Sequence, residues 1–290
     1  SSLQNAGTIE NKGVELQLFA TPIQSEGFRW DVRFNFTRNR NRVISLAEGI
    51  DNLQLAFFQE ATLNATPGQP YGTIRGTNYV YHENGQPIVD EFGFYLLSEN
   101  SNEIIGDINP DWLAGLSNSF NYKNFNLSFL IDIRKGGDIF SIDTFYGYST
   151  GLYDFSAANN DLGNPVRDPV TDGSDSGGVI LPGVQADGSP NTVRSDVSSD
   201  FNPWGYFGPQ AQHIYDGSFV KLREASLTYT LSDRLISKLP FTAASFSVIG
   251  RNLWIIDKNV PYADPEAGIS AGNLQGIQVG VYPSIREIGA

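Results

Sequence analysis

Two carboxylates separated by a single proline, Asp264 and Glu266, are the first residues of the sequence whose types and spacing suggest chemistry. A glycosidase uses two carboxyl groups about 5 to 10 Å apart, and one of them needs a raised pKa. Nothing in the neighbouring sequence supplies such a shift, and Pro265 favours a turn. We therefore expect a loop turn at this position rather than a catalytic pair.

The histidines and the acidic central segment do not point to a reaction either. His82 and His213 are the only two histidines, without the spacing of a zinc site or a catalytic dyad, and we expect both to face solvent in loops. Segment 138–216 is rich in aspartate, which raises calcium as a loop-ordering ion. Its Asp-Gly-Ser-Asp run at 172–175 does not follow the EF-hand spacing. The sequence thus predicts no enzyme, no catalytic residue, no metal site and no cofactor, with loop calcium as the alternative to a solvated acidic surface.

The composition favours an all-β protein. The 290 residues are 40% hydrophobic and 12% aromatic, with 30 glycines and 15 prolines, a mixture that suits many strands joined by turns. A net charge of -13 argues against a nucleic-acid partner. Without cysteine there are no disulfides and no thiolate metal sites. No segment has the roughly 18 consecutive apolar residues of a membrane helix, whereas a barrel strand needs only about ten alternating residues.

Alternation of apolar and polar residues marks two segments as strands long enough to cross a bilayer. In segment 28–37 every even position is large and apolar and every odd position is polar or charged, and segment 125–134 repeats the pattern with Leu130 as its exception. About ten residues is the length that a tilted barrel strand needs. We expect one face of these strands to contact lipid, formed by Phe28, Trp30, Val32, Phe34, Phe36, Phe125, Leu127, Phe129 and Ile131.

Weaker alternation completes a set of about seven strands, with the further segments at 14–20, 112–122, 218–231, 241–254 and 284–290. In one of them the apolar parity slips, which indicates a bulge near Glu224 or charges at Lys221 and Arg223 that snorkel to an interface.

The connections between these strands alternate strictly between short and long. The short ones are 21–27, 123–124 and 232–240, and the long ones are 45–110, 136–217 and 255–283. Outer-membrane barrels have this asymmetry, with tight periplasmic turns and long extracellular loops. An odd number of strands does not close a bacterial barrel, so we expect one sector of a larger antiparallel transmembrane β-barrel. Its first and last strands should pair with segments outside residues 1–290.

Five short motifs, in this order along the chain, resemble the C-terminal barrel region of SusC/RagA-type TonB-dependent transporters of Bacteroidota. They are Asn11–Leu16, Gly106–Trp112, Ser218–Glu224, Gly250–Leu253 and Ala263–Glu266, followed by Tyr282–Arg286 at the opening of the last strand. Each motif is short, but their order across nearly the whole chain makes the resemblance specific.

The resemblance implies a barrel of about 22 strands with a plugged lumen, located in the bacterial outer membrane as a multi-pass β-barrel. It also implies a SusD-like surface lipoprotein as a lid, TonB as the energy source, and a bulky oligosaccharide or peptide as the imported cargo. We expect residues 1–290 to be a C-terminal part of such a barrel, because no plug domain or TonB box is recognisable. The segment Ser1–Gln4 likewise lacks the basic and apolar regions of a signal peptide.

Aromatic residues in the long central connection are the candidates for contact with cargo or partner, since flat rings stack on sugars and pack against peptides. The candidates are Trp204, Tyr206, Phe207, Tyr146, Tyr148 and Tyr153. For Trp204, Tyr206 and Phe207 the alternative is that the rings only pack the loop on itself. For the tyrosines nearer the strand the alternative is an interfacial girdle.

A second class of protein also fits part of the pattern. In a soluble or surface-attached carbohydrate-binding β-sandwich, the alternating strands would bury one face against a second sheet. Such a sandwich does not explain charged residues opposite an unbroken aromatic face along a strand of bilayer length. It also does not explain two-residue turns alternating with very long loops.

Overall fold

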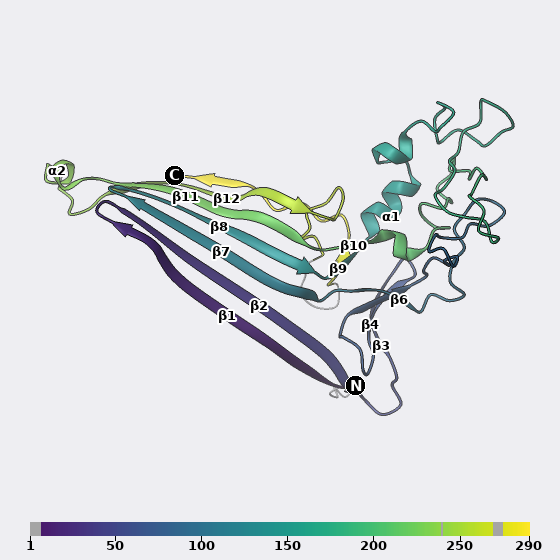
Figure 1. Ribbon diagram of the computed structural model, residues 1–290, viewed down its shortest axis with the longest axis horizontal. Coiled ribbons are helices and arrows are strands. Elements are labelled where there is room, and N and C mark those ends of the chain that lie inside the picture. The colour runs from purple at the N-terminus through teal and green to yellow at the C-terminus, as the bar shows by residue number, and fades with distance from the viewer. Residues whose placement is uncertain (1–6, 239, 269–274) are drawn as a thin grey trace.

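The computed structural model describes residues 7–238, 240–268 and 275–290, and its largest unit is an antiparallel sheet of seven strands (Figure 1). In spatial order they are β1 (Gly7–Ser25), β2 (Phe28–Leu46), β7 (Pro110–Tyr122), β8 (Phe125–Gly136), β11 (Phe219–Thr230), β12 (Ser245–Lys258) and β14 (Glu287–Gly289). The seven predicted strands are all present, and each lies beside its predecessor, as successive hairpins require.

Tight turns join the strands at one end of this sheet. Lys123 and Asn124 reverse the chain as predicted, with Tyr122 opposite Phe125. The first turn is shorter than the predicted 21–27, because β1 continues to Ser25 and leaves only two residues before β2. One of these, Gly27, has φ 81°, a left-handed conformation that glycine adopts without strain. The third connection contains the short helix α2 (Asp233–Ile236), and β12 begins at Ser245 rather than at 241.

A bulge interrupts β11 where the apolar parity slips. The register with β8 and the register with β12 both shift between Leu222 and Glu224. Against β8, Arg223 is the extra residue on β11, whereas against β12 the extra residue lies on β12, between Arg251 and Trp254. The two halves of β11 keep their apolar side chains on one face despite the slip in sequence. The predicted bulge near Glu224 is confirmed.

The register sorts the side chains of the sheet onto an apolar face and a polar face. Near the tight turns, one row across five strands is entirely aromatic, because Phe28, Tyr122, Phe125, Tyr229 and Phe246 are opposite one another in successive pairs. Toward the other end, Phe36 lies on the same face and contacts Trp112, with ring centroids 5.9 Å apart. Aromatic rings therefore border the apolar face at both ends.

The long connections are not featureless loops, because they fold into a separate region at the end of the sheet opposite the tight turns (Figure 1). A four-stranded sheet contains β3 (Leu53–Phe58), β4 (Ala61–Ala65), β5 (Thr73–Gly76) and β6 (Glu103–Asp107). A three-stranded sheet contains β9 (Asp138–Ser141), β10 (Ile214–Asp216) and β13 (Ile277–Gln278). The helices here are α1 (Ile142–Ser149), η1 (Asp154–Ala157) and η2 (Gln210–His213).

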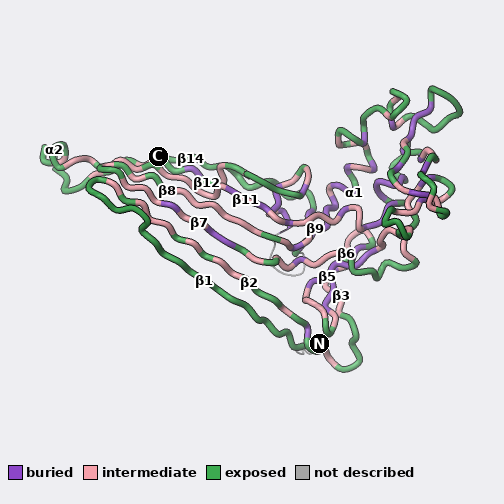
Figure 2. The backbone as a smooth tube through the Cα atoms, viewed as in Figure 1, coloured by how far each residue is buried: buried purple, intermediate pink, exposed green. Residues whose placement is uncertain are grey.

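Most of the buried core lies in this loop region rather than in the large sheet (Figure 2). One cluster joins the two small sheets through Leu63, Ile74, Phe140 and Ile277. By contrast, β1 is exposed along its whole length, and the seven-stranded sheet is open, with β1 and β14 at its edges. None of the helices in the described ranges has the length and apolarity needed to cross a membrane.

Candidate functional site

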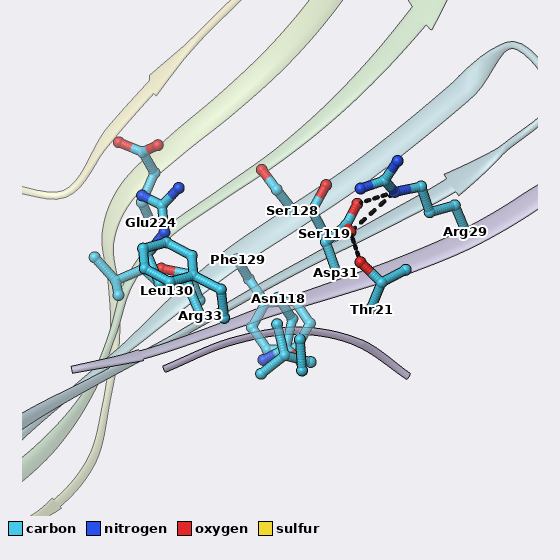
Figure 3. A pocket seen from close by; sticks show the side chains of 14 residues that line it. Thr21, Arg29, Asp31, Arg33, Asn118, Ser119, Ser128, Phe129, Leu130 and Glu224 are labelled. Atoms are coloured by element: carbon cyan, nitrogen blue, oxygen red, sulfur yellow. Dashed lines mark hydrogen bonds and ion pairs between the residues drawn. The ribbon is translucent and has the colours of Figure 1, made fainter. Parts of the chain in front are cut away.

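The polar face of the large sheet is concave and forms a wall of charged and hydroxyl side chains (Figure 3). Arg29, Asp31 and Arg33 of β2 lie opposite Asn121, Ser119 and Ser117 of β7. A hollow of about 660 Å³ opens on this face, and β8 and β11 contribute Ser128 and Glu224 to its lining. The odd-numbered residues of β2 thus line the inside of a curved wall, as their polarity predicts.

Hydrogen bonds within and between strands satisfy several polar groups of this wall. Asp31 accepts from Arg29 Nε at 2.8 Å and from Thr21 Oγ1 at 2.7 Å, while Ser128 and Ser226 share a hydrogen bond of 2.8 Å. These groups offer hydrogen-bond donors and acceptors to a polar solute that passes along the wall, and the carboxylate of Asp31 is committed to its neighbours.

The opposite, convex face carries the residues predicted to contact lipid. All nine have the same facing in the register, from Phe28 through Phe36 on β2 and from Phe125 through Ile131 on β8. A polar residue on this face, Asn118, is hydrogen-bonded through its Oδ1 to Trp30 Nε1 at 3.1 Å. Satisfying that amide matters because an unpaired polar group in hydrocarbon is costly. Contact with lipid itself remains a prediction.

A charge cluster lies where the polar wall meets the loop region. Lys221 of β11, only 3% exposed, contacts Asp264 at 2.5 Å and Glu266 at 2.6 Å. Arg223, the bulge residue, contacts Glu266 at 2.7 Å and Asp132 of β8 at 2.5 Å. We call Asp132, Lys221, Arg223, Asp264 and Glu266 the rim cluster. It ties the connection after β12 to the inner face of the sheet.

The Asp-Pro-Glu run is a turn, as predicted, since the Ala267 amide donates to the Asp264 carbonyl at 2.9 Å. It is also an ionic anchor, which the spacing alone did not reveal. Burial opposes ionisation of Asp264, but hydrogen bonds from Lys221 and from the backbone amides of Glu266 and Ser284 outweigh it and lower the pKa of Asp264 to about 2. A group held ionised in this way suits an anchor and not a general acid.

The signal that sequence reasoning missed was in β11. Lys221 and Arg223 lie in β11 where the apolar parity slips, and we expected either a bulge or side chains that snorkel to an interface. The bulge is present, but neither cation reaches for an interface, because both are paired with carboxylates on the polar side. Two cations in one strand segment should therefore have prompted a search for acidic partners.

A second anchor holds the same connection to the loop region. Ile277 and Gln278 of β13 pair in parallel with Phe140 and Ser141 of β9. The fully buried Gln278 accepts from Ser141 Oγ and donates to Asp143 Oδ2, and the Gly280 amide donates to Asp143 Oδ1 at 2.7 Å. The connection after β12 therefore joins the wall of the sheet to helix α1.

The aromatic candidates of the central connection divide into one buried ring and two exposed rings. Trp204 is 8% exposed and packs with Val166, Leu181 and Val197. Tyr206 and Phe207 are 44% and 46% exposed. Trp204 therefore belongs to the packing of the loop region on itself, which was the alternative, whereas the other two rings remain accessible at its surface.

The tyrosine candidates lie on and beside α1 rather than on a strand of the large sheet. Tyr148 donates to or accepts from the Tyr215 hydroxyl at 2.9 Å, and burial raises the pKa of Tyr148. Tyr153 stacks on Tyr262, with ring centroids 3.9 Å apart and planes at 14°. Tyr146 is 40% exposed and contacts Tyr206 edge to face. The structure thus brings Tyr146 and Tyr206 together at the surface.

The expectation of two solvent-facing histidines is wrong for His213, which is fully buried. Its Nδ1 shares a hydrogen bond of 3.1 Å with Thr144 Oγ1, and its ring packs edge to face against Phe145. Burial lowers the pKa of His213 to about 3, so the ring is neutral and forms part of the core. The position of His213 next to a loop rich in tryptophan and tyrosine did not predict its burial, and neither did its distance along the sequence from His82.

Within the described ranges, no group of three or more histidine or acidic side chains is gathered as a metal site. Calcium binding by the acidic central connection stays a hypothesis.

A curved antiparallel sheet of this kind, polar on its concave face and bordered by aromatic rings on its convex face, is a sector of a transmembrane β-barrel. No family model matches the chain. Its curated relatives include the TonB-dependent receptors P3 and P39 of Formosa agariphila, 28% and 27% identical over 99% and 98% of the chain. The TonB-dependent receptor SusC of Bacteroides thetaiotaomicron is 33% identical over 43% of the chain. The chain spans 28% of P3, 30% of P39 and 14% of SusC.

Solved structures agree with these relatives at the level of the fold. The RagAB peptide transporter matches 98% of the chain with a TM-score of 0.64 and 19% identity, over 29% of its own length. The RagAB peptide importer in its closed-closed state matches with a TM-score of 0.63 and 18% identity. The resemblance to SusC/RagA-type TonB-dependent outer-membrane transporters is thereby confirmed, and the fold is that of a sector of a β-barrel.

Proposed function

We propose that this chain forms part of the wall of an outer-membrane importer that moves a bulky nutrient without covalent chemistry. The observation that carries the proposal is the two-faced sheet, with an aromatic-bordered apolar exterior and a polar concave interior. The apolar face suits contact with lipid, and the polar face suits contact with a water-filled passage. The names of the relatives, TonB-dependent receptor and peptide transporter, support the same reading.

The finer parts of the proposal concern energy, lid and cargo. TonB would supply energy from the inner membrane, and a SusD-like lipoprotein would close the extracellular side above the loop region. The cargo would be an oligosaccharide or a peptide, both of which can pack against the exposed rings of Tyr206 and Phe207.

A carbohydrate-binding sandwich is the weaker alternative. It requires a second sheet packed about 10 Å from the apolar face of the first. In the part of the chain that the structure describes, the two small sheets lie beyond the end of the strands instead (Figure 1), so the apolar face stays uncovered.

Uptake of labelled cargo tests the function directly. Cells that carry the whole importer would be offered a fluorescent oligosaccharide and a fluorescent peptide, with a deletion of the importer and a deletion of TonB as separate controls. We expect uptake of one cargo to require both genes. Uptake that survives the loss of TonB would contradict the energised-import proposal, and a protein that stays monodisperse in plain buffer would favour the sandwich.

A further inference from the structure

A row of basic residues lies on the convex face, beyond its apolar part. It contains Lys12 of β1, Arg38, Arg40 and Arg42 of β2, and Lys135 of β8, and we call it the outer basic row. All five side chains are exposed. The row is notable because the chain as a whole carries a net charge of -13.

The register places these residues on the same face as the lipid-facing candidates. The pairing of β1 with β2 runs without a shift from Val32 to Val43, so Arg38, Arg40 and Arg42 face the same way as Phe36. Lys12 is opposite Arg40, and Lys135 is opposite Trp112. None of the five belongs to the polar wall.

The level of the row along the strands coincides with the edge of the apolar band. Arg38 is ten residues beyond Phe28 of the aromatic row near the tight turns. At about 3.3 Å per residue and a tilt of about 40°, this separation is about 25 Å along the barrel axis, which is the height of the apolar band in such barrels. The Phe36–Trp112 pair lies just below it, where an aromatic girdle is expected.

Three of these cations make an ion pair with a nearby carboxylate, and two do not. Arg40 contacts Asp111 at 2.6 Å, and Lys135 contacts Asp216 at 3.2 Å. Lys12 contacts Glu10 at 2.9 Å, and Glu10 is also opposite Arg42 in the register.

Arg38 and Arg42 make no ion pair with any residue of the described ranges. The row as a whole therefore keeps unsatisfied positive charge at the boundary of the apolar band.

We propose that the outer basic row binds phosphate groups on lipid headgroups of the outer leaflet. Arginine side chains lay their aliphatic stems along apolar surface and keep the charged group at the interface, and guanidinium matches phosphate oxygens in a bidentate fashion. The proposal rests on the proposed membrane location. It commits to a lipid rather than a free anion because the row lies on a convex face directly above apolar side chains that the acyl chains of the same molecule can cover.

The test uses the complete outer-membrane protein, purified in detergent and titrated with phosphorylated lipid A, with bound lipid counted by native mass spectrometry. The variant Arg38→Gln/Arg42→Gln should bind roughly thirtyfold more weakly, from two cations near the headgroups. The matched control Arg29→Gln/Arg33→Gln removes the same charge from the same strand on the polar face and should bind lipid A as the parent does. The charge-keeping variant Arg38→Lys/Arg42→Lys should keep the part of the binding that comes from charge and lose the bidentate part, so it should bind more weakly than the parent and more tightly than the double glutamine variant.

The outcomes separate this inference from the proposed function. Equal losses in both double glutamine variants would overturn the site, as would equal binding of lipid A stripped of its phosphates. Competition by millimolar inorganic phosphate as effective as by lipid A would assign the row to a soluble anion and overturn the lipid assignment. If the protein fractionates with the outer membrane and imports cargo while Arg38→Gln/Arg42→Gln binds as the parent does, this inference alone is wrong. A protein absent from the outer membrane would overturn both.

Discussion

Replacing Lys221 by methionine should release the connection after β12 from the wall of the barrel. The Lys221 ammonium is the shared partner of Asp264 and Glu266, and its side chain is 3% exposed. Methionine keeps the unbranched side chain up to the ε position and removes the charged ammonium, so Asp264 would remain buried as a carboxylate without its cation. Glu266 would keep Arg223 as a partner, which confines most of the damage to Asp264.

The size of the effect follows from the burial of the pair. Removing one member of a buried ion pair costs about 3 to 5 kcal/mol, because the other charge stays desolvated. Since Glu266 retains a partner, we expect the lower end, about 3 kcal/mol, which is roughly a hundredfold in a local opening equilibrium. The cost should appear locally, because the ladder hydrogen bonds between β8, β11 and β12 do not depend on the Lys221 ammonium.

Amide hydrogen exchange measures this opening at two chosen positions. The backbone amides of Glu266 and Ser284 both donate to the Asp264 carboxylate at 3.0 Å, so their exchange should accelerate by about a hundredfold in Lys221→Met. As a control, Arg251→Met on β12 removes a cation whose ion pair with Glu224 is largely exposed, and it should change these amides by less than about fivefold.

The double variant Lys221→Met/Asp264→Leu provides an internal check, because replacing both members of a buried pair by apolar groups is often neutral. Because Asp264→Leu also removes the acceptor of the Glu266 and Ser284 amides, the readout for this variant is proteolysis of the connection after β12, which should be slower than in Lys221→Met alone. Unchanged exchange at both amides in Lys221→Met would refute the rim cluster as an anchor, and equal acceleration in Arg251→Met would attribute the effect to general loss of charge.

Three further predictions address the membrane face, acid stability and the loop region. Val32→Arg should impair barrel assembly by about 2 to 4 kcal/mol, while Asn35→Ser on the polar face should assemble normally; equal heat-modifiable migration of the two variants would count against the assigned faces. Because the pKa of Asp264 is lowered to about 2, the ionised carboxylate contributes about 2 kcal/mol to stability above pH ~4, and this contribution is lost as the pH falls toward 2. Proteolysis of the loop region should therefore increase only between these pH values, and an onset near neutral pH would contradict the assignment. Trp204→Ala should lower the stability of the loop region by about 3 to 5 kcal/mol and speed its proteolysis. Tyr206→Ala should leave proteolysis unchanged and weaken the binding of cargo or lid, and the reverse pattern would contradict the placement of the two rings.

Local pattern in the sequence determined most of the large sheet. The period-two alternation of 28–37 and 125–134 specified strands and sorted their faces, since successive side chains of a strand point to opposite sides. Connection lengths specified which strands are neighbours, because a connection as short as Lys123-Asn124 can only reverse the chain. The slip of parity in β11 indicated either a bulge near Glu224 or charges that snorkel, and the structure has the bulge.

The tertiary structure alone decided what the long connections do. Lys221 and Asp264 are 43 positions apart, and Gln278 reaches Asp143 across 135, so no periodicity links the members of either anchor. Burial of His213 and Trp204 likewise depends on chain segments that irregular loops bring together. A strand can be recognised from a repeating local pattern of apolar and polar residues. An irregular loop is instead held by a few specific contacts between residues far apart in the sequence, and these contacts form only when the whole chain has folded.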